Sequence, residues 1–338
     1  MKKINVAING FGRIGRAACK IIINDFPNIQ VVAVNDLTDA STLAHLLAYD
    51  SCYGKYQKVI KANKDSITIG KHKIPVLSIK EPSELPWKKL KVDVVLECTG
   101  RFRTKEDLSL HLQAGAKKVI LSAPAKKGGV KSIVLGVNEN KLNKSDHVIS
   151  CASCTTNCLA PTTAVIKKYF GIKKALMTTI HAYTADQNLV DGPHKDLRRA
   201  RAAALNLVPT TTGAATATGE VVPSLNNNFD GLAVRVPTPV GSLCDTVYHL
   251  NKKTSAEAVN KAFQQAARGP LRGIIEASEE ELVSTDIIGN NHSAIVDLKS
   301  TKVVGGDLLK VVTWYDNEWG YSCRLVELAA YISKYLNK

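Results

Sequence analysis

The sequence predicts an α/β protein of two domains: a doubly wound parallel sheet, then an α+β domain with a mainly antiparallel sheet. In residues 1–150, short β-branched runs alternate with helical patterns, as in parallel sheets covered by helices on both faces. After residue 150, strand patterns follow one another with few helices between them. The length of 338 residues also suits about two domains.

The first domain, placed at residues 1–152, begins with an expected strand at residues 4–8 and a helix at residues 14–24. Further strands are expected at residues 31–34, 92–96 and 118–121, with a helix at residues 105–114. Residues 67–74 predict a small antiparallel hairpin inserted among these units.

The second domain, placed at residues 153–317, opens with a predicted helix from Thr155 to Tyr169 and a strand from Ala175 to His181. Residues 191–204 form a long stretch rich in Arg and Ala. Strands are then expected at residues 232–236, 243–250, 295–297 and 309–314, and a helix at residues 255–268. A final helix, about Glu318–Leu336, is expected to complete the first domain, which then includes residues 318–338.

Composition indicates an ordinary globular protein, with 45% hydrophobic and 22% charged residues. No apolar run approaches the roughly 18 residues of a membrane-spanning helix, and the first residues do not resemble a signal peptide. We therefore expect a cytoplasmic protein with no membrane partner. The net charge of +15 favours anionic partners. The lysines are dispersed or paired, which favours phosphorylated metabolites; nucleic acid stays an alternative that no basic stripe indicates.

A glycine-rich turn follows the first strand and opens the first helix. Gly10, Gly12 and Gly15 form a G-x-G-x-x-G pattern, which suits a tight turn, close approach to a pyrophosphate and close helix packing. Asp36 ends the next strand, 21 residues after Gly15, and would bind ribose hydroxyls while repelling a 2′-phosphate. We predict a Rossmann-type site for NAD rather than NADP. Arg13 fits either a phosphate contact or surface charge.

Three of the eight cysteines cluster at Cys151, Cys154 and Cys158. Without a secretory signal or a second ligand pair, neither disulfides nor a metal site is expected. Cys154 begins a helical pattern, where the helix dipole and free amides would lower the pKa of its thiol. Cys158, one turn later, is expected to be a packed thiol, and Cys151 is undecided. His181 is a candidate base, although a lone histidine after a strand is also a common structural residue.

Segments along nearly the whole chain resemble the glyceraldehyde-3-phosphate dehydrogenase family. They are residues 8–16, 152–158, 181–184, 196–204, 212–215, 235–239 and 314–318. The Ser-Cys-Thr-Thr-Asn-Cys stretch at residues 153–158 is highly specific to this family. The resemblance implies a glycolytic and gluconeogenic oxidoreductase. It would convert D-glyceraldehyde 3-phosphate, NAD and inorganic phosphate to 1,3-bisphosphoglycerate and NADH through a cysteine thioester.

The resemblance also implies residue roles. Cys154 would be the nucleophile and His181 its base and later proton donor. The substrate phosphate would be held by Thr184, Arg198 with its neighbour Arg199, and Arg235; the inorganic phosphate pocket would comprise Ser153, Thr155, Thr212 and Gly213. Further cofactor contacts would be Arg13, Ile14, Asp36, Lys80, Ser122 and Asn317, with Asn317 holding the nicotinamide amide. Residues 191–204 would form the S-shaped loop at the core of a homotetramer.

The chain departs from the family pattern at three places. Cys151 stands where Asn is usual, Thr216 where Lys is usual, and residues 239–242 differ from the usual Pro-Asn-Val-Ser. None of these changes removes a catalytic group. Three other functions compete: an enzyme of the same fold that oxidises erythrose 4-phosphate, a nucleic-acid-binding protein, and a cysteine hydrolase. The hydrolase gives no reason for a dinucleotide motif or phosphate-binding arginines.

Overall fold

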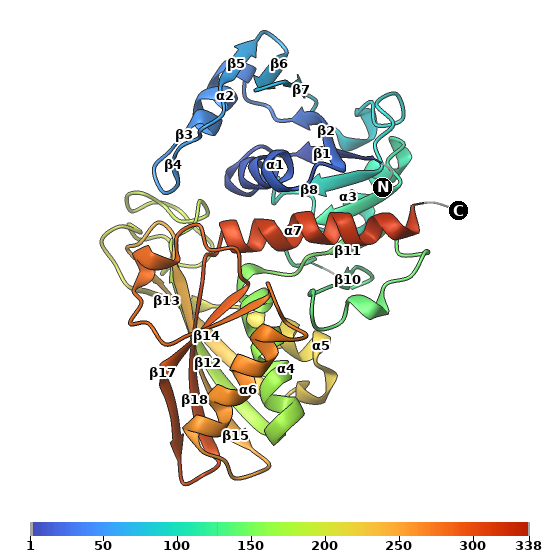
Figure 1. The fold of residues 1–338 in the computed structure, drawn as a ribbon. Helices are drawn as coiled ribbons and strands as arrows, with labels where there is room; N and C mark the ends of the chain where they lie inside the picture. Colours follow the sequence, from blue (N-terminus) through green and yellow to red (C-terminus); the bar gives the residue numbers. More distant parts are fainter. Residues whose placement is uncertain (1–2, 127, 337–338) are drawn as a thin grey trace. The chain divides into compact units, whose positions relative to one another are not determined.

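The computed structural model describes residues 3–126 and 128–336 and divides the chain into two units (Figure 1). The first comprises residues 1–133, 140–152 and 322–338, and the second residues 134–139 and 153–321. Residues 1–2, 127 and 337–338, which belong to the predicted first domain, lie outside the described residues.

The first unit contains a nine-stranded sheet in the order β10-β11-β9-β8-β1-β2-β7-β6-β5. The strands are β1 Ile4–Asn9, β2 Ile29–Asn35, β5 Ile60–Asn63, β6 Ser66–Ile69, β7 His72–Leu77, β8 Val94–Glu97, β9 Lys118–Leu121, β10 Lys131–Ser132 and β11 Val148–Ser150. The pairs from β10 to β7 are all parallel. The predicted parallel sheet is therefore confirmed.

Helix α1 (Arg13–Asp25) contacts β1 and β2, and α3 (Lys105–Gln113) contacts β9 and β11. Every residue of β8 and β9 is buried, as expected for strands covered on both faces. The residues of α3 follow a capping box, in which Thr104 accepts from the backbone N–H of Asp107 and Asp107 accepts in return. This local signal explains why the predicted helix starts where it does.

The predicted hairpin is present, because β6 and β7 pair antiparallel. It is not separate from the main sheet, however: β7 also pairs parallel with β2, through Val34–Val76 and Asn35–Leu77. The hairpin thus satisfies the backbone groups of β2 that would otherwise form an open sheet edge. The sequence pattern alone did not indicate this extension.

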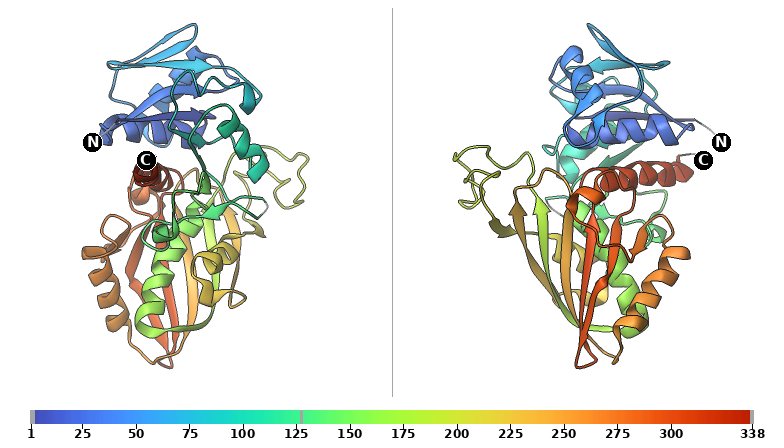
Figure 2. Two further views of the ribbon diagram at one scale, coloured as in Figure 1. Left: turned by 90° about the vertical axis from the view of Figure 1, so that its right-hand side faces the viewer. Right: turned by 60° about the vertical axis from the view of Figure 1, so that its left-hand side comes forward.

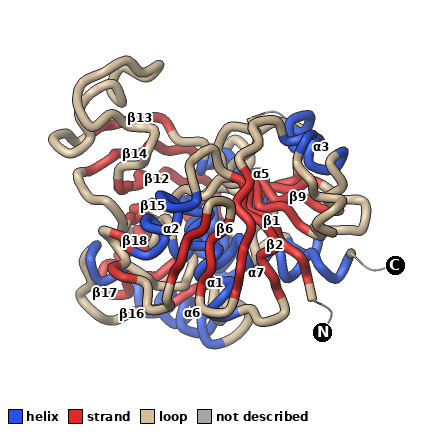
Figure 3. Tube along the Cα trace, turned by 90° about the horizontal axis from the view of Figure 1, so that it is seen from above, coloured by secondary structure: helices blue, strands red, loops and turns tan. Residues whose placement is uncertain are grey.

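The second unit contains a seven-stranded sheet in the order β13-β14-β12-β15-β18-β17-β16, which Figure 3 shows side by side. The strands are β12 Ile172–Ala182, β13 Val208–Thr211, β14 Phe229–Val236, β15 Ser242–Leu250, β16 Ile275–Ser278, β17 Ala294–Val304 and β18 Leu308–Tyr315. Only β12–β14 and β16–β17 pair parallel. The other neighbours pair antiparallel, as predicted.

Three helices lie on one face of this sheet (Figure 2): α4 Cys154–Phe170, α5 Ala214–Val221 and α6 Ala256–Arg268. Ser153 caps α4 and Ser255 caps α6, each by accepting a hydrogen bond from a backbone N–H of the first turn. The burial pattern of β15 alternates strictly between buried and half-buried residues. A strand with one face on the core has this pattern.

Some elements escaped the sequence patterns. These are helix α2 (Ala40–Ala48), the small hairpin of β3 (Tyr49–Asp50) and β4 (Gly54–Lys55), the short strands β5, β10 and β11, helix α5, and the edge strands β13 and β16. The last helix, α7, spans Trp319–Ile332 and is followed by a short 3-10 turn. Residues 183–207 contain no helix or strand (Figure 2). Among the described residues, no helix is both long and apolar enough to cross a membrane.

Candidate functional site

The glycine-rich turn between β1 and α1 is explained by close contacts. Gly10 has a φ of 91°, and a Cβ atom there would lie 2.7 Å from the backbone nitrogen of Thr99. A Cβ on Gly15 would lie 2.2 Å from the carbonyl oxygen of Gly10. No side chain is therefore tolerated at either position. Gly12 differs, because a Cβ there would meet nothing within 4 Å. Its backbone faces open space at the start of α1.

Gly12 is also the N-cap of α1 and provides no side-chain hydrogen bond to the helix. The first backbone N–H groups of a helix point outward and carry the positive end of its dipole. An open N-terminus preceded by a bare backbone is the arrangement that accommodates a pyrophosphate. This end of α1 therefore fits the dinucleotide that the motif predicts.

A pocket lies beside this turn. Its lining includes Gly10, Gly12, Asn35, Asp36, Leu37, Ile79, Lys80, Cys98, Thr99, Arg101 and Phe102. Asp36 is held in place because Oδ2 accepts from the Phe11 N–H at 2.7 Å and Oδ1 from the Thr38 N–H at 3.0 Å. A fixed carboxylate next to the glycine turn fits a ribose with free hydroxyls and opposes a 2′-phosphate.

Five of the expected cofactor residues do not line this pocket: Arg13, Ile14, Gly15, Ser122 and Asn317. Nη1 of Arg13 lies 2.6 Å from Oδ2 of Asp50, and its guanidinium lies over the ring of Tyr53. Of the two alternatives for Arg13, the structure shows a partly exposed ion pair. Ile14 and Ser122 are both half-buried, in the first turn of α1 and directly after β9.

The second unit brings Cys154 and His181 together, although 27 residues separate them. Cys154 is the first residue of α4, and His181 lies at the end of β12. Sγ of Cys154 lies 3.4 Å from Nε2 of His181. A thiol and an imidazole at this distance can exchange a proton.

The other ring nitrogen of His181 has two close neighbours. Nδ1 lies 2.6 Å from the carbonyl oxygen of Ala182 and 2.8 Å from Nη1 of Arg235. The carbonyl oxygen of Ala182 only accepts and is the nearer of the two neighbours, and Nη1 of Arg235 donates to the same oxygen at 3.0 Å. We therefore assign the imidazole proton to Nδ1, which donates to the nearer carbonyl. This tautomer leaves the lone pair of Nε2 directed at the thiol.

Burial, followed by the Arg235 cation, lowers the pKa of His181 to about 3. The imidazole is therefore a neutral base at physiological pH. Burial raises the pKa of the Cys154 thiol above its ordinary value, while Arg235 and hydrogen bonds with Thr155 act in the opposite direction. The sequence-based expectation of a lowered thiol pKa is wrong, because desolvation outweighs the effects that favour the thiolate. Thiol and imidazole form a neutral pair.

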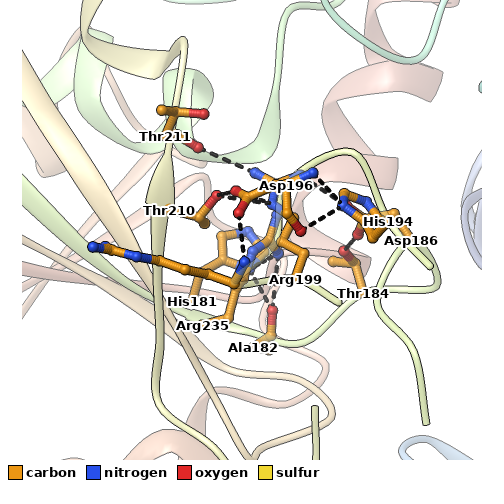
Figure 4. A network of polar contacts seen from close by, with 11 residues as sticks. His181, Ala182, Thr184, Asp186, His194, Asp196, Arg199, Thr210, Thr211 and Arg235 are labelled. Carbon is orange, nitrogen blue, oxygen red and sulfur yellow. Dashed lines mark hydrogen bonds and ion pairs between the residues drawn. The ribbon is translucent and has the colours of Figure 1, made fainter. Parts of the chain in front are cut away.

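A network of charged and hydroxyl groups surrounds His181 (Figure 4). Nη1 of Arg199 lies 2.9 Å from Oδ2 of Asp186, and its Nε donates to Thr210 Oγ1 at 2.9 Å. Thr184 donates through its hydroxyl to the other oxygen of Asp186. Burial disfavours the ionised form of Asp186, but Thr184, Arg235 and Arg199 together lower its pKa. Arg199 also lies 3.6 Å from Oδ2 of Asp196, so the network has two arginines and two carboxylates, and Arg235 is the cation that contacts the imidazole itself. Arginine side chains on this side of His181 suit a phosphorylated substrate.

Arg198 lies differently from its neighbour. Its side chain is exposed, and its Nη1 donates to the carbonyl oxygen of Pro209 at 3.5 Å. The structure thus brings Arg199, and not Arg198, into contact with Asp186 and Thr210. The sequence motif contains both arginines, and nothing in their spacing distinguishes them.

The residues expected for inorganic phosphate lie at two helix N-termini. Ser153 caps α4, and Gly213 is the N-cap of α5 without a side-chain hydrogen bond. A Cβ on Gly213 would meet nothing within 4 Å, so this backbone is open. Thr212 accepts from the Ala214 N–H at 3.2 Å. The open end of α5 fits an anion.

Thr155 is buried, and its hydroxyl lies 2.9 Å from the hydroxyl of Tyr315. Tyr315 also lies 2.9 Å from Thr179 Oγ1 and places its ring edge-on to His181, with centroids 6.0 Å apart. Tyr315 therefore supports both Thr155 and His181. Sequence reasoning did not single it out, although it lies in a segment that carries the family resemblance.

Asn317 follows β18 and is held by the segment that departs from the family pattern. Its Oδ1 accepts from the Gly241 N–H at 3.2 Å and the Ser242 hydroxyl at 2.8 Å. These two donors determine which way the amide faces. Gly241 has a φ of 93°, and a Cβ there would lie 2.4 Å from the carbonyl oxygen of Ser284. The departure at residues 239–242 thus forms a tight turn that orients Asn317.

Five of the other seven cysteines are buried, namely Cys19, Cys151, Cys158, Cys244 and Cys323, and Cys52 and Cys98 are half-buried. Cys158 is fully buried with its Sγ 3.3 Å from Thr313 Oγ1, so the prediction for this residue is confirmed. Cys151, undecided from sequence, is also buried. No cluster of three or more potential metal ligands occurs within residues 3–126 and 128–336.

Comparison with known proteins agrees with this geometry. Residues 4–105 match the family model "Glyceraldehyde 3-phosphate dehydrogenase, NAD binding domain", and residues 153–317 match "Glyceraldehyde 3-phosphate dehydrogenase, C-terminal domain". The chain is 52% identical over 331 residues to glyceraldehyde-3-phosphate dehydrogenase of Geobacillus stearothermophilus, covering 98% of both chains. It is 52% identical to glyceraldehyde-3-phosphate dehydrogenase 1 of Bacillus subtilis over 98% of both chains. It is 53% identical to the Mycobacterium avium enzyme over 98% of this chain and 99% of the other. The chain therefore belongs to the glyceraldehyde-3-phosphate dehydrogenase family.

Proposed function

We propose that this chain oxidises D-glyceraldehyde 3-phosphate with NAD and inorganic phosphate, producing 1,3-bisphosphoglycerate and NADH in glycolysis and gluconeogenesis. The observation that carries the proposal is the 3.4 Å contact between Cys154 Sγ and His181 Nε2, with Arg235 directly behind the imidazole. This arrangement supplies a nucleophile, a neutral base and a cation for a phosphorylated aldehyde.

The covalent chemistry belongs to Cys154. Its sulfur attacks the aldehyde carbon while the thiol proton moves through His181 Nε2 to the carbonyl oxygen, giving a thiohemiacetal. His181 then takes the hydroxyl proton as the C–H hydrogen leaves as hydride, and the product bound to sulfur is a thioester. Inorganic phosphate attacks the thioester carbon, the acyl phosphate leaves, and the proton on His181 returns to the sulfur. The backbone N–H of Cys154 would stabilise the oxyanion in both additions.

The two phosphate groups need separate sites. Thr184, Arg199 and Arg235 would hold the phosphate of the aldehyde, because they surround His181. Ser153, Thr155, Thr212 and Gly213 would receive inorganic phosphate. We place Arg199 ahead of Arg198 in this role, since only Arg199 joins the network around Asp186.

The cofactor would be held by the glycine turn of Gly10, Gly12 and Gly15, with Asp36 on the adenosine ribose and Lys80 at the pocket rim. Arg13, Ile14 and Ser122 would contribute from around the turn, and the oriented amide of Asn317 would bind the nicotinamide carboxamide. When bound, NAD supplies the acceptor for the hydride.

We also propose the organisation that the resemblance implies. Residues 1–152 with 318–338 would form the NAD-binding domain, and residues 153–317 the catalytic domain. The working enzyme would be a cytoplasmic homotetramer, with residues 191–204 at its core.

Formation of NADH, followed by absorbance with purified full-length protein, tests the proposal. Turnover should require both glyceraldehyde 3-phosphate and phosphate or arsenate. Erythrose 4-phosphate is the matched substrate control, because it has one more carbon and the same phosphate. NADH formation that is independent of phosphate, or faster with erythrose 4-phosphate, would contradict the proposed reaction.

A further inference from the structure

Glu97, at the end of β8, is fully buried and accepts four hydrogen bonds. Its Oε1 accepts from the backbone N–H of Thr99 at 2.8 Å and from the Thr99 hydroxyl. Its Oε2 accepts from Nδ2 of Asn9 at 2.5 Å and lies 3.1 Å from Nε2 of His111. The side chain of His111 is also fully buried. None of the steps proposed above uses either residue.

One branch of this network runs through His111. Nε1 of Trp87 donates to Nδ1 of His111 at 3.0 Å. An indole nitrogen is only a donor, so Nδ1 must be the acceptor and the imidazole proton must be on Nε2. That Nε2–H then donates to Glu97. His111 is therefore neutral, and the negative charge of Glu97 is held by hydrogen bonds alone.

The other branch runs through two asparagines. The backbone N–H of Ile79 donates to Oδ1 of Asn35 at 2.9 Å, and Nδ2 of Asn35 donates to Oδ1 of Asn9 at 2.7 Å. Nδ2 of Asn9 then donates to Glu97. Both branches begin at a group that only donates, so every bond points toward position 97. With the Thr99 hydroxyl also donating, an ionised carboxylate, which only accepts, completes such a network.

This network holds the walls of the pocket beside the glycine turn. Asn35, Ile79 and Thr99 all line that pocket. Gly10 packs against the Thr99 nitrogen that Glu97 holds, and the Gly10 N–H donates to the carbonyl oxygen of Asn35 at 2.8 Å. Asn9, Asn35 and Glu97 end the neighbouring parallel strands β1, β2 and β8. One carboxylate thus joins the three strand ends that surround the dinucleotide motif.

We propose that Glu97 is a positioning residue for NAD: its charge holds the three strand ends in the geometry that binds the cofactor. The inference rests on the proposed function, because it assumes that this pocket takes NAD. Glu97 does not line the pocket, so it acts through Asn9, Asn35 and Thr99. It should affect binding of the cofactor and not the chemistry at Cys154.

Glu97→Gln tests the proposal in the full-length protein. The new amide N–H₂ would face two donors, Asn9 Nδ2 and His111 Nε2. Neither donor can become an acceptor, because the branch behind it would then place another donor against the N–H of Ile79 or of Trp87. The opposed donors should displace the three strand ends that form the pocket, so the dissociation constant of NAD should rise about tenfold or more. At saturating NAD, kcat and the KM values for aldehyde and phosphate should stay within about twofold of the parent.

Lys118→Met is the matched control. Lys118 is buried at the opposite end of the same sheet, and its Nζ donates to the carbonyls of Lys144 and Asp146. This variant should lower Tm and leave NAD affinity unchanged. If Glu97→Gln does not fold, Asn9→Ala, which removes one branch without opposing donors, should still weaken NAD binding.

Equal NAD affinity in the parent and in the folded Glu97→Gln protein would overturn the inference, as would an equal loss of affinity in Lys118→Met. With Asn9→Ala as the folded variant, parent-like NAD affinity would overturn it too. Failure of the parent protein to bind NAD would instead contradict the proposed function. Titration of NAD by fluorescence quenching, with Tm measured on the same samples, separates these results.

Discussion

Nη1 of Arg235 lies 2.8 Å from Nδ1 of His181, so a permanent cation stands directly behind the imidazole that faces Cys154. Arg235 is itself half-buried, and its Nη1 also donates to the carbonyl oxygen of Ala182. The histidine is thereby kept unprotonated, which is the state that a general base requires. We expect this arrangement to affect stability as well as the proposed chemistry.

Burial and Arg235 lower the pKa of His181 from 6.5 to about 3. Below pH 6.5 the unfolded chain binds a proton at this residue, and the folded chain does not until about pH 3. The free energy of unfolding is therefore unaffected by the titration of this residue above pH 6.5, and it decreases as the pH falls from 6.5 towards 3. At pH 5 the free energy of unfolding should be about 2 kcal/mol lower than at pH 7 because of this residue.

Urea unfolding of the parent and of His181→Asn at pH 7 and pH 5 measures this contribution. The parent should lose more free energy of unfolding between the two pH values than the variant does. An identical loss in both proteins would mean that His181 is not kept neutral by the folded structure.

The two helical cysteines should behave differently on substitution. Cys154→Ser should reduce phosphate-dependent NADH formation by at least about a thousandfold, because the nucleophile is lost. Cys158→Ala should retain most of the activity and lower Tm, because this thiol is fully buried against Thr313. Near-normal turnover by Cys154→Ser would contradict the covalent route.

Arg199 and Arg198 offer a matched pair of substitutions. Arg199→Ala removes charge-assisted bonds worth about 1.5–3 kcal/mol each, so KM for the aldehyde or for phosphate should rise about tenfold or more. Arg198→Ala should change either value by less than about twofold, because an exposed cation contributes little. Steady-state kinetics of both variants, with each substrate varied in turn, measures these KM values. The reverse order of effects would restore Arg198 as the phosphate ligand.

Asp36→Ala should change the choice of cofactor. The carboxylate repels a 2′-phosphate, and removing it should reduce the ratio of kcat/KM for NAD over NADP by at least about tenfold. Leu37→Ala is a suitable control, since Leu37 is the next residue, lines the same pocket and is 62% exposed but uncharged. Cofactor ratios for Asp36→Ala that match the parent would argue against the role of Asp36.

Much of the fold followed from sequence periodicity because the strands are either continuously apolar or strictly alternating. β8 and β9 are buried at every residue and β15 alternates, and each pattern was recognisable. The missed elements are short or lie at sheet edges, as with β13, β16 and α5. Short elements depend on pairing with distant partners, so their local pattern is weak.

Local sequence patterns predicted only part of the candidate site. The glycine turn, Asp36 and the cysteine at the start of α4 form local patterns with a physical reason. Three other features depend on residues far apart in the chain. They are the contacts that distinguish Arg199 from Arg198, the packing of Tyr315 against His181, and the hydrogen bonds that orient Asn317. Family resemblance carried the pairing of Cys154 with His181, because residue pattern alone did not distinguish His181 from the other histidines.

By itself the sequence determined the two kinds of sheet, the dinucleotide turn and the cysteine at the start of α4, because each depends on residues close together in the chain. Only the tertiary structure decided the protonation of the Cys154–His181 pair. That depends on burial and on Arg235, which is 54 residues from His181 in the chain and 2.8 Å away in space. Desolvation is a property of the packed molecule, so the expected lowering of the thiol pKa was reversed.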